Sequence, residues 1–202
     1  MNRADALEAF AKAYTRRMPE DEAPTIDGEQ LDAEIRHLFD FFDERGRTPL
    51  ALRAFNPTVD THGYDAPGTV LEVVIDDMPF LIDSVTNRLG ALGYTVVRHF
   101  HPVVGTTRDA SGSLVGVGPG REAEHRESIQ HYELAETLSA EQRGRLEAEI
   151  HSTLNEVSTT VRDFEPMRFA VRRMAHYVFE DAAAFDTGDV EEAVAFLEWL
   201  LG

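Results

Sequence analysis

The chain has 202 residues, of which 37 are acidic and 19 basic, for a formal net charge of −18. This length allows one domain with helical additions or two small domains, and it suffices for a core without disulfides or metals. The absence of cysteine excludes disulfides, thiolate metal ligands and a cysteine nucleophile. The acidic charge argues against a nucleic-acid-binding protein, because binding phosphate needs a basic surface.

No targeting or membrane segment is visible. The first twenty residues mix charges into their apolar stripe, unlike a signal peptide. The apolar runs are far shorter than the ~20 residues that a membrane span needs. We therefore expect a cytoplasmic protein without a membrane partner.

The N-terminal region is predicted to be helical. Apolar residues recur at helical spacing from Ala6 to Tyr14, and Met18-Pro19 predicts the end of this helix. After an acidic loop, a second helix is predicted over residues 28–44, with Gly46 as its stop.

The middle of the chain reads as strands around one helix. Residues 50–55 and the β-branched segment 69–76 predict two strands. Asp76, Asp77 and Pro79 then predict an acidic cap at the start of a helix that ends at Gly93. Further strand segments are a long one at 95–108, the return after a hairpin turn at 109–112, and residues 127–134.

The C-terminal region is again helical. Ser139 and Gln142 form a capping-box pattern at the start of a long amphipathic helix, and Pro166 permits a new helix to start. Asp189 with Glu192 predicts a cap for the last helix. That helix ends in Trp199, Leu200 and Leu201 with nothing after them to cover them, so we expect a fragment of a longer chain.

This order of elements predicts an α+β sandwich of the ββαββα type. We expect a four-stranded, mainly antiparallel sheet with helices on one face, plus N-terminal and C-terminal helices. The predicted organisation is an N-terminal helical segment over residues 1–47, a sheet domain over 48–181, and a linker with the start of a further connection over 182–202.

The motifs of nucleotide-dependent and nucleophilic enzymes are missing. The glycines of residues 116–120 do not fit the dinucleotide loop, and there is no P-loop. Ser84 lies in a predicted helix rather than on a nucleophile elbow. Lys12 is the sole lysine and lies on a polar helix face, where catalysis by an amine is not favoured.

One set of histidines suggests a metal site. His99 and His101 are two apart in a predicted strand and share a face, and His131 could join them if the strands pair. Polar packing on a half-exposed strand is the simpler interpretation. The metal-based alternative is a metal-dependent hydrolase using these three residues.

The turn before the central helix is the remaining candidate site. Asp76 and Asp77 complement the positive end of a helix, whereas Asp83 could face a neighbouring loop or a ligand amine. A structural role is the simpler interpretation. The candidate ligand-binding residues are Asp76, Asp77, Met78, Pro79, Phe80, Asp83 and Ser84.

This segment also carries a family resemblance. Residues 76–85, DDMPFLIDSV, resemble a segment near the N-terminus of the large NAD-specific glutamate dehydrogenases of bacteria. Residues 101–104 with Arg108, Asp109 and Gly112 fit the stretch that follows in that family. Weaker matches, in the same order along the chain, are Asn56-Pro57, Glu127-Ser128-Ile129 and Glu192 through Trp199-Leu200.

The resemblance implies that residues 48–181 are an ACT-like domain with a regulatory or assembly role and no catalytic residues. The parent enzyme would oxidise L-glutamate with NAD to 2-oxoglutarate, ammonium and NADH, and catalysis would belong to a later domain. This chain would bind no cofactor. An alternative is an amino-acid-sensing domain that binds an effector at residues 76–84, but the absence of glycine from the D-D-M-P loop favours the structural role.

The resemblance also implies partners: the rest of the parent polypeptide, further copies in a homo-oligomer, and an amino-acid effector. We expect the last helix to dock on its own domain, on a second copy, or on a downstream domain. Because the charge of −18 opposes association, any dimer is expected to tighten as salt rises.

Overall fold

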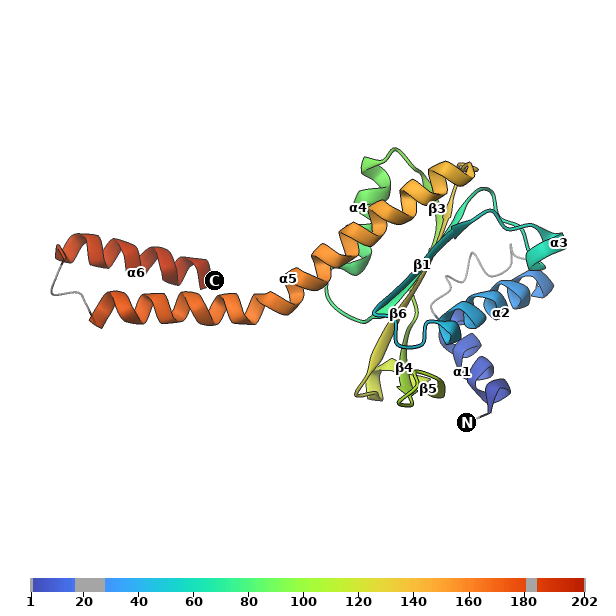
Figure 1. Cartoon of the computed structure of the whole chain (residues 1–202), viewed down its shortest axis with the longest axis horizontal. Coiled ribbons are helices and arrows are strands. Elements are labelled where there is room, and N and C mark those ends of the chain that lie inside the picture. The colour runs from blue at the N-terminus through green and yellow to red at the C-terminus, as the bar shows by residue number, and fades with distance from the viewer. Residues whose placement is uncertain (1, 17–27, 181–184, 202) are drawn as a thin grey trace. The chain divides into compact units, whose positions relative to one another are not determined.

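The computed structural model describes residues 2–16, 28–180 and 185–201 (Figure 1). It divides into two compact units, residues 1–154 and 155–202. The domain boundaries expected at residues 47/48 and 181/182 remain predictions. The elements are α1 (Arg3–Thr15), α2 (Gly28–Glu44), β1 (Leu50–Phe55), α3 (Val59–His62), β2 (Val70–Asp76), α4 (Leu81–Ala91), β3 (Val96–Phe100), β4 (Val103–Arg108), β5 (Leu114–Pro119), η2 (Gly120–Glu122), β6 (Arg126–Leu134), α5 (Ala140–Glu180) and α6 (Thr187–Leu201).

The first unit is built on a six-stranded antiparallel sheet in the order β1-β2-β6-β4-β5, with β3 also paired to β6. The α+β class is confirmed, but the four-stranded sheet is wrong. Pro102 has no N–H for a ladder, and it divides the expected long strand into β3 and β4. The returning segment forms its own strand, β5, in a hairpin with β4.

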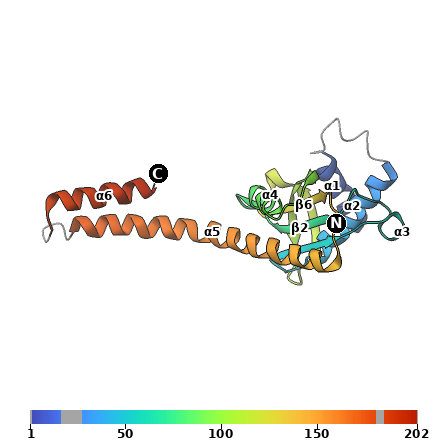
Figure 2. The same ribbon diagram turned by 90° about the horizontal axis from the view of Figure 1, so that it is seen from above.

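Helices cover both faces of this sheet, so the expectation of helices on one face is also wrong. Residues 70–75 of β2 and 127–134 of β6 are buried without alternation, which requires cover on both sides. On one face α1 and α2 pack their aromatic side chains against Val74, Phe100 and Ile129. The other side carries α4 and the first turns of α5 (Figures 1 and 2).

Several local signals are confirmed. The helix α2 has the bounds predicted for it. The hairpin turn forms as expected, since the Asp109 carboxylate accepts from the backbone of Ser111 and Ser113. At the start of α5, Gln142 accepts from the backbone N–H of Ser139 and the Ser139 hydroxyl accepts in return, which is a capping box.

Three helix boundaries differ from the prediction. The helix α4 begins only after Phe80, so Asp77 does not cap it and Pro79 precedes it. At α6 the backbone of Gly188 donates to Asp186, which takes the place expected for Asp189. The helix α5 continues through Pro166, because a proline removes one backbone hydrogen bond without forcing a break.

The end of the first helix predicted at Met18-Pro19 lies outside the described residues. Within the parts of the chain that are described, no helix combines the length and the apolar character that crossing a membrane requires.

Candidate functional site

The first two residues of the predicted turn face arginines of the same unit. The Asp76 carboxylate lies 2.8 Å from the Arg45 guanidinium and 3.5 Å from Nε2 of His125. Asp77 donates its backbone N–H to the carbonyl of Arg126, and its carboxylate lies 3.3 Å from the Arg126 guanidinium. These contacts join the end of β2 to Arg45, which follows α2, and to Arg126, which begins β6.

Most of the remaining candidate residues of the turn are exposed to solvent. Phe80 has a left-handed backbone, with φ of 72°, and its side chain is 64% exposed. Asp83 is exposed in the first turn of α4, and within the described part of the chain no hydrogen bond to its carboxylate is seen. Met78 and Ser84 are half-buried and Pro79 is exposed. Among the described residues, the arginines that contact Asp76 and Asp77 form no ion pair or hydrogen bond with Asp83 or Ser84.

A hollow of about 340 Å³ lies beside Asp76. Its arginines could bind a carboxylate and its aspartates could bind an amine, which are the two charged groups of an amino acid. It is lined by Arg45, Gly46, Arg47, Thr48, Pro49, Asp76, Arg108, Asp109, Gly112 and His125. None of the other residues predicted for the ligand site reaches it.

The arginines of this hollow already have partners within the fold. Glu127, fully buried, lies 2.7 Å from the Arg45 guanidinium and 2.8 Å from Nε of Arg108. Arg108 also donates to the carbonyl of Phe42, at 2.8 Å. Burial would raise the pKa of Glu127, but Arg108 and Arg45 hold it below its usual value. The ion pairs of Glu127 with Arg45 and Arg108 therefore stabilise the walls of this hollow.

The three histidines do not form one cluster, because the rings of His99 and His101 stack at 6.4 Å but His131 does not join them. His99 is paired with Tyr132 across β3 and β6 and stacks on its ring at 4.2 Å, whereas His131 is paired with Phe100. Residues directly opposite in an antiparallel pair share a face, so His131 lies on the opposite face of the sheet from His99. Burial, followed by the charges of His101 and His131, lowers the pKa of His99 to about 4. The three-histidine metal site is wrong.

His101 has a different partner that resembles a catalytic pair. Its Nε2 atom lies 2.8 Å from the Ser128 hydroxyl, as a base lies from a nucleophile. Ser128 is completely buried, however, and also accepts from Gln130 at 3.2 Å. A hydroxyl that no substrate can reach cannot attack, so the pair is structural.

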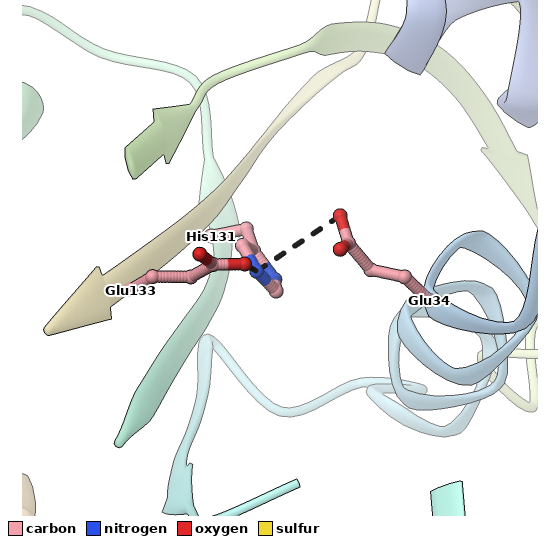
Figure 3. Close-up of side chains that lie close together, drawn as sticks. All are labelled: Glu34, His131 and Glu133. Carbon is pink, nitrogen blue, oxygen red and sulfur yellow. Dashed lines mark ion pairs between the residues drawn. The ribbon is translucent and has the colours of Figure 1, made fainter. Parts of the chain in front are cut away.

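A buried ion network lies between α2 and the sheet. The carboxylates of Glu34, Glu72 and Glu133 converge on His131, with Glu34 reaching from α2 toward the two β6 residues (Figure 3). Nδ1 of His131 is 3.2 Å from Glu72, and Nε2 is 3.5 Å from Glu133 and 3.9 Å from Glu34. Arg98 bridges Glu34 and Glu133.

The network balances its charges without a metal. Burial alone would lower the pKa of His131, but Glu34, Glu133 and Glu72 raise it to about 9, so the ring is protonated at neutral pH. Its positive charge, with those of Arg53 and Arg98, matches the three carboxylates. Glu34, His131 and Glu133 could ligate a cation by distance, but Arg98 already occupies the position between the two carboxylates.

Sequence reasoning missed this network, although one signal was present. Glu72 interrupts the β-branched run of β2, and a charged residue inside a fully buried strand needs a partner. Nothing in the sequence pairs it with His131, which is 59 positions away.

Comparison with known proteins places the chain in a family. A family model described as "Glutamate dehydrogenase, ACT1 domain" matches residues 10–150. The NAD-specific glutamate dehydrogenase of Pseudomonas aeruginosa is 32% identical over 168 residues, which are 81% of this chain and 10% of that protein. The NAD-specific glutamate dehydrogenase of Halomonas elongata is 29% identical across 99% of this chain and 13% of its own length.

The chain thus spans 10% and 13% of the length of these two curated relatives. The family match covers both α2 and the sheet that share the ion network. On the residues matched and the α+β fold that they adopt, this chain belongs to the glutamate dehydrogenase ACT1 domain family.

Proposed function

We propose that this chain is a non-catalytic, ACT-like regulatory or assembly domain of an NAD-dependent glutamate dehydrogenase in the cytoplasm. The parent enzyme would convert L-glutamate and NAD to 2-oxoglutarate, ammonium and NADH. In this proposal the chain itself binds no cofactor, and its partners are the rest of the parent polypeptide and further copies of it.

The internal pairing of the buried charges is the observation that carries the proposal. Reaction chemistry needs groups that are free to touch a substrate. Here Glu127 is held by two arginines, and the carboxylates around His131 are held by that ring and by Arg98. This pattern supports a rigid module that positions other parts of a protein.

The proposal is tested by removing the domain from the parent enzyme. Deleting residues 1–202 should leave glutamate oxidation per folded parent molecule within about threefold, while the assembly or effector response changes. The isolated chain should form no NADH from glutamate and NAD. Loss of catalysis in a deletion variant that still folds would contradict the proposal.

One feature favours the amino-acid-sensing alternative as a second candidate. A left-handed, exposed phenylalanine is a costly conformation, and such strain is found at functional sites. Calorimetric titration of the chain with each common amino acid distinguishes the two. Saturable binding that is lost in Phe80→Ala and retained in Val59→Ala, a control at another exposed apolar residue, would favour sensing.

A further inference from the structure

The second compact unit, residues 155–202, is a hairpin of two helices. In both views α6 lies antiparallel beside the second part of α5 (Figures 1 and 2). Val190, Val194 and Leu197 are the buried residues of α6. Arg168 of α5 donates to the carbonyl of Leu201, at 3.5 Å. The hairpin therefore buries one apolar stripe of α6.

This hairpin carries most of the exposed large hydrophobic side chains found in the described part of the chain. Nine of the thirteen exposed large hydrophobic side chains found among the described residues belong to it, although it holds under a quarter of the sequence. Trp199 is 74% exposed and Met167 63%. The nine are Phe164, Met167, Phe169, Met174, Tyr177, Phe185, Phe196, Trp199 and Leu200. A helix that is apolar on several sides is normally buried in a larger assembly.

The spacing of these residues fits a helical bundle. On α5 an apolar seam alternates three and four residues apart, the repeat of packed helices: Phe164, Met167, Val171, Met174 and Val178. On α6 a second seam lies beside the buried one: Ala193, Phe196 and Leu200. A bundle helix needs an apolar face wide enough for two neighbours, and each helix of this hairpin has only one neighbour within its unit.

One segment of α5, residues 164–178, carries charges complementary to those of α6. Between Phe164 and Val178, α5 carries three arginines and one glutamate. The helix α6 carries four acidic residues and no base: Asp189, Glu191, Glu192 and Glu198. A twofold axis would place α5 of one chain beside α6 of its partner, and the same contact would occur twice. Each contact would then join the basic segment of α5, residues 164–178, to the acidic helix α6.

The exposed surface is large enough for a stable pair. A buried aromatic or similar side chain covers about 150–250 Å². The exposed members of the two seams, together with Trp199, are six large side chains that are between 48% and 74% exposed. Covering these would remove roughly 600–900 Å² from each chain, against the ~800 Å² per partner of a standard interface.

We propose that this hairpin docks on the hairpin of a second copy of the chain to form a four-helix bundle. The proposal deepens the assembly role proposed above and rests on it. The dimer proposal is tested by the oligomeric state of the isolated chain, which does not depend on regulation or catalysis in the parent enzyme. A failure of the dimer proposal is therefore distinguishable from a failure of the proposed function.

The first test is sedimentation equilibrium of the whole 202-residue chain and of surface variants. The unmodified chain should dimerise, and Phe196→Glu or Met167→Glu should raise the dimer Kd about 30-fold or more, since each places a charge in a seam. Val59→Glu is the matched control, because Val59 is 54% exposed but lies in the first unit, and it should leave Kd unchanged. Circular dichroism verifies the helix content of each variant.

The second test uses charge reversal. Arg172→Glu with Arg173→Glu, and separately Glu191→Arg with Glu192→Arg, should each raise the Kd about tenfold. Mixing the two variants should restore a heterodimer close to the unmodified Kd, because every contact again joins opposite charges. A monomeric unmodified chain would overturn the proposal and assign the surface to another part of the parent protein. Dimers that persist in both seam variants, or a mixture that stays dissociated, would overturn it as well.

Discussion

Nδ1 of His131 lies 3.2 Å from the carboxylate of Glu72, and neither side chain is exposed to solvent. The two residues are directly opposite each other on β6 and β2. A buried carboxylate is tolerated only when it is paired, and a buried imidazole beside it gains a proton for the same reason. This pair therefore links the stability of the fold to pH.

The first prediction concerns alkaline pH. The pKa of His131 is raised from 6.5 to about 9 in the folded state, so protonated His131 stabilises the fold fully below pH 6.5. That contribution is lost as the pH rises through 9. The free energy of unfolding should fall by about 3 kcal/mol over this window. Urea denaturation at a series of pH values from 6 to 10 measures it.

His131→Gln is the variant that checks the assignment. It should be less stable than the parent at pH 7, because three carboxylates then face two arginines, and its stability should change little between pH 6.5 and 9. His151→Gln, at an exposed position of α5, should keep the parent pH dependence. A parent chain whose unfolding free energy is flat across this window would show that His131 is not protonated in the fold.

The second prediction concerns Glu127. Its replacement by Gln should destabilise the chain by about 3–5 kcal/mol, since buried Arg108 would lose the carboxylate of Glu127 and Arg45 would keep only that of Asp76. Urea unfolding at pH 7 measures the change, with exposed Glu124→Gln as the control within about 0.5 kcal/mol of the parent. Equal stability of the two variants would mean that the ion pairs do not stabilise the fold.

The third prediction concerns residues 1–47. Their helices supply most of the buried cluster that covers one face of the sheet, including Phe10, Tyr14 and Leu38. A chain that starts at residue 48 should therefore lose cooperative unfolding and its near-ultraviolet dichroism. Leu38→Ala in the whole chain should cost about 2–5 kcal/mol. A sharp transition in the shortened chain, at the parent midpoint, would instead support a domain boundary at residues 47/48.

The sequence predicted those features that depend on local chemistry. The bounds of α2 follow from its apolar stripe and its glycines, and the turn at 109–112 follows from an aspartate that accepts backbone hydrogen bonds. Features that depend on distant pairing could not be predicted. The network around Glu72 joins segments up to 99 positions apart, from Glu34 to Glu133, and no local pattern encodes it.

Predictions from the sequence were wrong where the residue type is compatible with two different local structures. Pro102 was compatible with a continuous strand but divides it, because a proline in the ladder has no N–H to donate. Pro166 was compatible with a helix start, yet α5 continues through it. The acidic residues 76 and 77 resembled a helix cap, whereas Asp76 pairs with Arg45 and α4 starts four residues after Asp77.

The fourth prediction concerns Phe80, whose φ of 72° is unfavourable for any side chain with a Cβ atom. Glycine adopts this conformation without steric cost, whereas a β-branched residue is strongly disfavoured there. Because the Phe80 side chain is 64% exposed, its removal loses few packing contacts. Phe80→Gly should therefore be about 1–2 kcal/mol more stable than Phe80→Val.

Asn87 provides the control, since it is exposed inside α4, where glycine is a poorer helix former than valine and the order of stability should reverse. Urea unfolding of the four variants measures both differences, and a valine at position 80 that is as stable as glycine would show that this residue is not left-handed in solution.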